Sequence, residues 1–128
     1  MIAQAAATRE RLGSHISASE WLLAGWLDER GCAVVHQRAV GPYNIDLVAA
    51  DTVAVEVFGG NWHSTGDHGR RFAKRAAYIA DLGWPQCYVW DQARCPLGVE
   101  AADYVVAYGE EARRDPSLRG EYRMIRGD

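Results

Sequence analysis

One segment of the chain constrains its fold more than any other: residues 53–58, which read Val-Ala-Val-Glu-Val-Phe. The run is almost continuously apolar and rich in β-branched residues, and it is bounded by Asp51-Thr52 on one side and Gly59-Gly60 on the other. Such a run is typical of a buried strand inside a sheet, not of a strand with one solvent-facing side. The sequence therefore predicts a sheet that other elements cover.

The flanking patterns predict those other elements. Ser17-Ala18-Ser19-Glu20 reads as a capping box and predicts a helix that Gly31 ends. Residues 1–15 have no clear period and are expected to fray or to form a short helix. Further strands are expected over 32–38, 44–49, 86–90 and 120–126, the last at an edge, and further helices over 67–82 and 99–113. The order α-β-β-β-α-β-α-β predicts one α/β domain, residues 1–128, around a mixed sheet.

Composition excludes several classes of protein. The 128 residues suffice for one compact domain, and 48% of them are hydrophobic, so the chain can build a core. No apolar run approaches the roughly 18 residues of a membrane span. The three cysteines, Cys32, Cys87 and Cys95, are an odd number without CxxC spacing, which argues against a disulfide framework or a zinc finger. We expect a soluble intracellular domain that does not associate with membranes.

The charge pattern indicates one local basic surface on an acidic protein. A net charge of -3 argues against a protein that coats nucleic acid by bulk electrostatics. Four basic residues nevertheless fall together in the predicted helix 67–82, and they are Arg70, Arg71, Lys74 and Arg75. Such a pattern suits an enzyme that binds phosphate at a single local site.

Two acids lie in apolar strands and are the first candidates for chemistry. Asp46 stands between Ile45 and Leu47, and Glu56 stands between Val55 and Val57. Burial of an unpaired carboxylate costs several kcal/mol. Because the two strands are hairpin partners, both carboxylates can converge on one point, where a hard divalent cation would stabilise the pair. The alternative is that strand alternation turns both acids to solvent on an uncovered face.

Three further residues have a functional and a structural interpretation. Glu20 lies at the edge of the buried stripe of its helix, where it is either the capping-box acceptor, a third acid near a metal, or both. Trp62 and His63 follow a double glycine in a loop, where an exposed Trp beside His suggests a ligand contact, although a loop histidine is more often inert. His63 and His68 lack a second ligand pair at metal spacing, so we do not expect them to form a zinc site.

The ordered set GPYNIDLVA, VAVEVFGGNWH and a basic helix ending in LGWPQCYVW resembles the very-short-patch-repair branch of the PD-(D/E)XK nuclease superfamily. It is also similar to small bacterial and phage proteins of the same restriction-endonuclease-like fold. The resemblance covers roughly residues 17–92. It implies a three-layer sandwich with a mixed central β-sheet flanked by helices, and a location in the cytoplasm of a bacterial or phage-infected bacterial cell.

The resemblance also implies roles for individual residues. Asp46 corresponds to the metal-binding aspartate, Glu56 to the acid of the E-x-K element and the Val57 carbonyl to a further metal ligand. Glu20 corresponds to the glutamate of the first helix. His63 corresponds to the histidine that acts as general base, and Trp62 to an aromatic that wedges into the DNA stack. The expected cofactor is Mg²⁺ or Mn²⁺.

Two departures from the family pattern matter. Phe58 replaces the lysine of E-x-K, so the usual cation that activates water is missing and His63 would have to supply that function. The positions of the repair enzymes' structural zinc ligands read Gly60, Thr65, Asp67 and Gln92, so no structural zinc is expected. The resemblance therefore implies the hydrolytic core without mismatch specificity.

Together these observations favour a Mg²⁺-dependent DNA endonuclease. Asp46 and Glu56 would bind the metal, His63 would activate water, and Arg70, Arg71 and Lys74 would contact phosphates. The alternative is a catalytically inactive DNA-binding or protein-interaction module that retains the fold, which Phe58 favours. Because 128 residues leave little room for a recognition domain, a homodimer or a partner protein is the expected source of specificity.

Overall fold

The computed structural model describes residues 5–8, 10, 16–59 and 66–125. Residues 5–8 are helical. The elements that follow are α2 (Ala18–Glu29), β1 (Val34–Val40), β2 (Tyr43–Ala49), β3 (Val53–Gly59), α3 (Gly66–Asp81), β4 (Gln86–Asp91), α4 (Glu100–Arg114), a 3-10 turn (Pro116–Leu118) and β5 (Tyr122–Ile125). Their order is the predicted one. None of the described helices combines the length and the apolar character that crossing a membrane requires.

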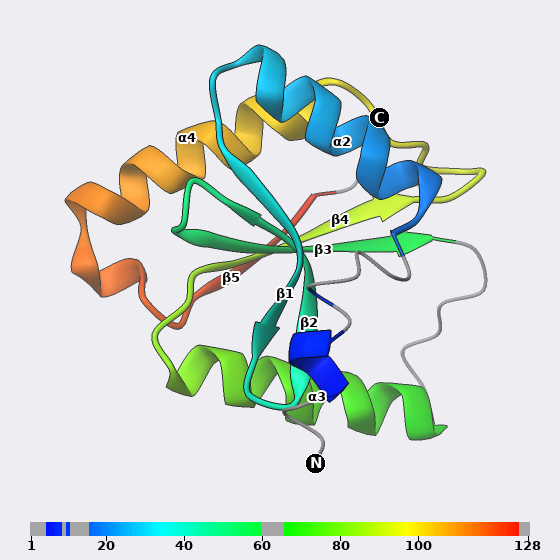
Figure 1. The fold of residues 1–128 in the computed structure, drawn as a ribbon, viewed down its shortest axis with the longest axis vertical. Helices are drawn as coiled ribbons and strands as arrows, with labels where there is room; N and C mark the ends of the chain where they lie inside the picture. Colours follow the sequence, from blue (N-terminus) through cyan, green and yellow to red (C-terminus); the bar gives the residue numbers. More distant parts are fainter. Residues whose placement is uncertain (1–4, 9, 11–15, 60–65, 126–128) are drawn as a thin grey trace.

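The five strands form one sheet in the order β1-β2-β3-β4-β5 (Figure 1). β1, β2 and β3 are joined by tight turns and pair antiparallel, whereas β3, β4 and β5 pair parallel because a helix connects each strand to the next. α3 covers one face of the sheet, and α2 and α4 cover the other (Figure 1). The prediction of an α/β fold with a mixed sheet flanked by helices is thus confirmed.

β3 lies in the middle of the sheet and contributes to both of its faces. Val53 and Val55 belong to the larger core under α2 and α4, which also includes Leu23, Leu27, Leu47, Val89, Val105 and Tyr108. Ala54 belongs to the smaller core under α3, with Val40, Ile45, Val48 and Ile79. Burial on both faces explains why residues 53–58 are apolar almost throughout.

The hairpin of β1 and β2 contacts α3 at its turn. Gly41 has a φ of +58°, and a Cβ atom there would lie 2.1 Å from the hydroxyl of Tyr78 on α3. The Tyr78 ring packs edge-on against Tyr43, with 5.4 Å between the ring centroids. Glycine is required here both for its left-handed backbone and for the close approach of the helix. This contact fixes the start of β2 next to α3.

Candidate functional site

The candidate site lies where β2 and β3 stop pairing. Their ladder runs from Ala49 and Val53 to Leu47 and Val55 and ends there. One step further, the Val57 N–H donates to the Asp46 carboxylate, at 2.9 Å from Val57 N to Asp46 Oδ2. Asp46 therefore replaces the missing strand partner of a backbone donor. The Val57 carbonyl faces the same edge of β3, because the N–H and C=O of one residue in an extended strand point the same way.

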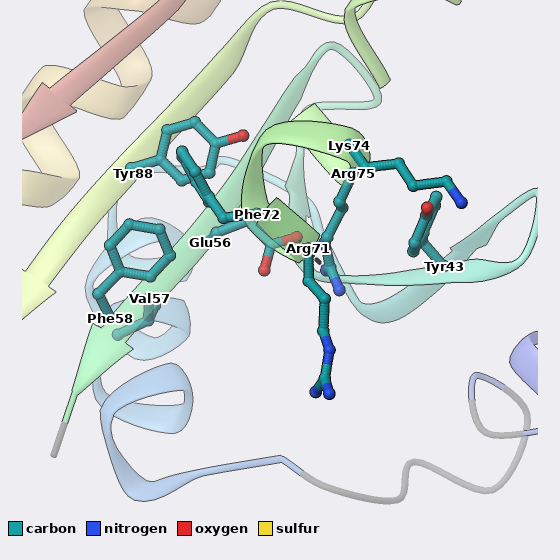
Figure 2. Close-up of a pocket in the computed structure, with 9 residues that line it drawn as sticks. All are labelled: Tyr43, Glu56, Val57, Phe58, Arg71, Phe72, Lys74, Arg75 and Tyr88. Atoms are coloured by element: carbon teal, nitrogen blue, oxygen red, sulfur yellow. Dashed lines mark hydrogen bonds and ion pairs between the residues drawn. The ribbon is translucent and has the colours of Figure 1, made fainter. Parts of the chain in front are cut away.

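Glu56 is buried in this gap, with 7% of its surface exposed. Its carboxylate accepts a hydrogen bond from the Arg75 guanidinium of α3 and forms an ion pair with it (Figure 2). Burial raises the pKa of Glu56 well above its usual range, and the charge of Asp46 raises it further, although Arg75 acts in the opposite direction. Glu56 thus faces the protein interior, where a single guanidinium only partly offsets the cost of its charge.

Glu20 reaches the same place from the first turn of α2. Its backbone N–H donates to the side chain of the N-cap residue Ser17, at 3.2 Å, as the capping box predicts. Its carboxylate is almost fully buried. Burial and the charge of Asp46 raise the pKa of Glu20 to about 7, while hydrogen bonds from Gln37 and from the Ser17 backbone lower it. Glu20 is therefore part of the helix cap and lies close to Asp46, whereas its role as a third acid near a metal stays a prediction.

Gln37 connects the carboxylates. Its side-chain amide donates to Glu20 Oε1 at 3.1 Å and to Asp46 Oδ1 at 3.3 Å. Gln37 is buried within β1, yet its φ is +52°, a left-handed conformation that non-glycine residues rarely adopt inside a strand. Its own carbonyl accepts from the Asn44 side chain at 2.7 Å. Strained backbone of this kind is often found at functional sites.

His36 lies beside the acids on β1. Its Nδ1 is 3.7 Å from Glu20 Oε2, and its ring centroid is 4.5 Å from that of Trp21. Burial lowers the pKa of His36, which favours the neutral imidazole, so His36 and Glu20 do not form an ion pair. Within the described part of the chain, its buried Nδ1 has no hydrogen-bond partner. His36 is a histidine near the carboxylates that the sequence analysis did not single out.

The basic side chains of α3 point in two directions. Arg70, Arg71 and Lys74 are on the exposed side of α3, as helical spacing predicts. Arg75 instead turns toward the sheet, where its guanidinium also lies 5.5 Å from the centroid of the Tyr43 ring. Arg75 is thus the cation of α3 that contacts a candidate catalytic acid.

Phe58 belongs to an aromatic cluster. Its ring stacks on Tyr88 with 5.2 Å between centroids, and it meets Phe72 and Trp90 edge-on at 5.6 and 6.0 Å. Phe58 can supply no charge there. The positive charge beside Glu56 comes instead from Arg75, on α3.

Trp62 and His63 lie outside the described residues. Their expected roles, as the DNA wedge and the general base, therefore stay predictions. Gly60 and Thr65, two of the positions that correspond to zinc ligands, also lie there, so the expected lack of a structural zinc site stays a prediction too.

A cavity of about 310 Å³ opens onto the acids, and its lining includes Gln37, Asp46, Glu56 and Arg75. Within the described residues, no group of three or more His, Cys, Asp and Glu side chains is arranged to hold a metal ion. Mg²⁺, however, is commonly held by one or two carboxylates and completes its shell with water and substrate phosphate. Asp46, Glu56 and the Val57 carbonyl are hard oxygen donors, and two neighbouring carboxylates, one of them buried, favour a divalent cation. The residues present therefore fit Mg²⁺.

Sequence reasoning missed two residues for which signals existed. If Gly41-Pro42 is a two-residue hairpin turn, the strand register places Gln37 directly opposite Asp46. The observed pairs on either side, His36 with Leu47 and Arg38 with Ile45, have this register. Arg75 follows Phe72 by three residues and precedes Ile79 by four, so helical spacing places it on the apolar face. His36 had no comparable signal, because its position depends on how α2 packs against β1.

No protein-family model, curated protein or solved structure matches this chain. Its function is therefore argued from its own side chains. The site combines three clustered acids, a bridging amide and one half-buried guanidinium beside an exposed basic helix surface.

Proposed function

We propose that this chain is a metal-dependent DNA endonuclease with a restriction-endonuclease-like fold. The observation that carries the proposal is the end of the pairing between β2 and β3. There Asp46 and Glu56 come together, and the Asp46 carboxylate accepts from the Val57 N–H. An αβββαβ order with acids on the second and third strands is also what the resemblance to PD-(D/E)XK nucleases implies. A buried glutamate beside a second acid at a break in the sheet serves the fold poorly, because the desolvation of its carboxylate is costly.

The side chains have distinct roles in this proposal. Asp46, Glu56 and the Val57 carbonyl hold Mg²⁺ or Mn²⁺, which supplies the charge that polarises the scissile phosphate. Gln37 orients the Asp46 carboxylate through its hydrogen bond. Arg75 offsets the charge of Glu56 and reaches the same cavity.

The remaining roles concern water and DNA. His63 activates or orients the attacking water, a role that suits its near-neutral intrinsic pKa. Arg70, Arg71 and Lys74 contact phosphates from the exposed side of α3, and Trp62 stacks on bases. Glu20 remains partly protonated near neutral pH, since burial raises its pKa to about 7.

One observation favours a second candidate function. The Arg75 guanidinium binds the Glu56 carboxylate directly, and Phe58 is packed among aromatic rings. A site in which an arginine stays paired with the carboxylate, and so keeps a metal ion from it, would bind DNA without cutting it. The alternative is therefore a DNA-binding module that retains the fold and has lost the chemistry.

A plasmid assay decides between the two functions. Supercoiled DNA is incubated with the protein and Mg²⁺, Mn²⁺ or EDTA, and nicked product is measured. We expect nicking with either metal and none with EDTA. Asp46→Asn should abolish nicking while circular dichroism shows an intact fold, and Asp28→Asn, an exposed aspartate on α2, should nick like the wild type.

The contrary results are equally clear. DNA binding without nicking under any metal condition would establish the inactive module. Nicking by Asp46→Asn at the wild-type rate would show that the carboxylate cluster is not the active site.

A further inference from the structure

A second cavity adjoins the carboxylates and has a different lining. It lies between the sheet and α3, and its volume of about 540 Å³ falls within the range of pockets that hold small ligands. It shares Tyr43, Glu56 and Arg75 with the cavity that opens onto Asp46. Two cavities of different character thus meet at one ion pair, that of Glu56 and Arg75.

One end of the second cavity is an aromatic wall, made of Phe58, Phe72 and Tyr88 (Figure 2). Phe72 meets the rings of Phe58 and Tyr88 edge-on, with centroid distances of 5.6 and 5.1 Å. Phe58 and Tyr88 are nearly completely buried, whereas Phe72 is only partly buried. Phe72 is therefore the most accessible ring of the wall to a ligand in the cavity, and the other two rings pack against it.

The other side of the cavity is cationic. Arg71 and Lys74 are exposed on α3, and Arg75 lies deeper, next to Glu56 (Figure 2). The lining thus carries three basic side chains against one acid, in a protein whose net charge is -3. A ring surface next to local positive charge complements a ligand that has both an aromatic base and a phosphate.

We propose that this cavity receives the base of an unpaired DNA nucleotide. The base stacks on Phe72, and its phosphates contact Arg71 and Lys74. The inference rests on the proposed function, since it takes DNA as the substrate. Bases inside a duplex are paired and stacked, so a base enters an enclosed pocket only from a single strand or after it is flipped out. A base held at Phe72 brings its own phosphodiester toward Glu56, where the two cavities meet.

Fluorescence anisotropy in EDTA measures binding without cleavage. The probes are a labelled single-stranded oligonucleotide and the fully paired duplex of the same sequence. We expect the wild type to bind the single strand more tightly. Phe72→Leu preserves apolar packing but removes the ring, and should weaken single-strand binding about 5- to 150-fold, the range for losing one base stack. Duplex binding should not change.

A matched control comes from the opposite face of the sheet. Tyr104 is an exposed aromatic residue on α4, so Tyr104→Leu should leave both affinities unchanged. Circular dichroism verifies that each variant is folded. If Phe72→Leu does not fold, Arg71→Ala with Lys74→Ala tests the cationic side, and should weaken single-strand binding and reduce its salt dependence.

The outcomes separate this inference from the proposed function. Equal affinity for both probes, or unchanged single-strand binding in the folded variants, overturns the base pocket, even if the protein nicks plasmid with Mg²⁺. Phe72-dependent single-strand binding without any metal-dependent nicking supports the pocket and overturns the proposed hydrolysis.

Discussion

Gln37 is a buried polar side chain on a strained backbone, and the carboxylates account for both properties. A left-handed non-glycine residue costs on the order of 1–3 kcal/mol, so it persists only where its surroundings determine it. Here the surroundings are Glu20 and Asp46, which accept from the Gln37 amide, and Asn44, which donates to its carbonyl. A leucine at this position would leave Glu20 and Asp46 without the hydrogen bonds that Gln37 donates.

The first prediction concerns Gln37→Met, which keeps the size of the side chain and removes its donor. The Gln37 hydrogen bond lowers the pKa of Glu20, so its loss should make the charged carboxylate harder to bury. At about pH 8 the free energy of unfolding should fall by about 1–3 kcal/mol, and by less at about pH 4, where Glu20 is protonated. Urea unfolding followed by circular dichroism measures both values. An equal loss at both pH values would mean that Gln37 serves packing alone.

A second prediction at this scale concerns the two histidines. In the proposed endonuclease His63 is the expected base, so His63→Ala should slow cleavage roughly 10²- to 10⁴-fold. Single-turnover cleavage at saturating enzyme measures the effect without a contribution from DNA affinity. His36→Ala is the comparison, because His36 lies near Glu20. If His36→Ala rather than His63→Ala caused the loss, the assignment of the base would move to β1.

At the scale of secondary-structure elements, the two sides of α3 have different proposed roles. Its inner side carries Phe72, Arg75 and Ile79 toward the sheet, while Arg70 and Lys74 remain exposed. The apolar period of the sequence places Phe72 and Ile79 on one side and Arg70 and Lys74 on the other, because spacing alone determines which residues share a helix face. Spacing cannot predict that Arg75 contacts Glu56, because that contact depends on the distance between the helix and β3.

The same limit applies to the strands. Residues 53–58 predict a buried strand because apolar content reports burial directly, and the turns at 41–42 and 51–52 predict the hairpins. The end of the β2–β3 ladder before Asp46 has no local signature, because it results from how two whole strands diverge. The convergence of Asp46 and Glu56 was therefore predictable, whereas the hydrogen bond from Val57 was not.

The third prediction tests the exposed side of α3. Arg70→Glu with Lys74→Glu should weaken DNA binding to a similar degree for every sequence, because phosphate contacts carry no sequence information. Each lost contact should also reduce the slope of log affinity against log salt by about 1. Anisotropy titrations over a range of salt concentrations measure both effects. Arg113→Glu with Arg114→Glu, at the end of α4 on the other face, is the matched control.

On the scale of the whole molecule, the carboxylate cluster couples stability to pH. The pKa of Glu20 is raised by burial from 4.5 to about 7, and burial raises that of Glu56 as well. The folded state therefore binds more protons than the unfolded state between about pH 4.5 and pH 7. Stability should fall as pH rises through this window and level off above it.

The fourth prediction follows from this sign. In EDTA, the free energy of unfolding should decrease by on the order of 3 kcal/mol between about pH 4.5 and pH 7 from Glu20 alone. Glu20→Gln should remove most of that slope. If Mg²⁺ binds the neighbouring acids, it should raise the melting temperature more above this window than below it, because metal binding favours charged carboxylates. Thermal unfolding at several pH values measures both effects, and a wild-type profile that rises with pH would contradict the burial argument.

The bond from the Val57 amide to Asp46 has a practical consequence. Most strand amides bond to carbonyls, whose charge does not change, but this amide bonds to a group that can gain a proton or a metal ion. Its nuclear magnetic resonance signal is therefore a built-in reporter of the ionic state of the Asp46 carboxylate. A titration with Mg²⁺ or with acid can be followed at that one backbone resonance, without any substrate and without any altered residue.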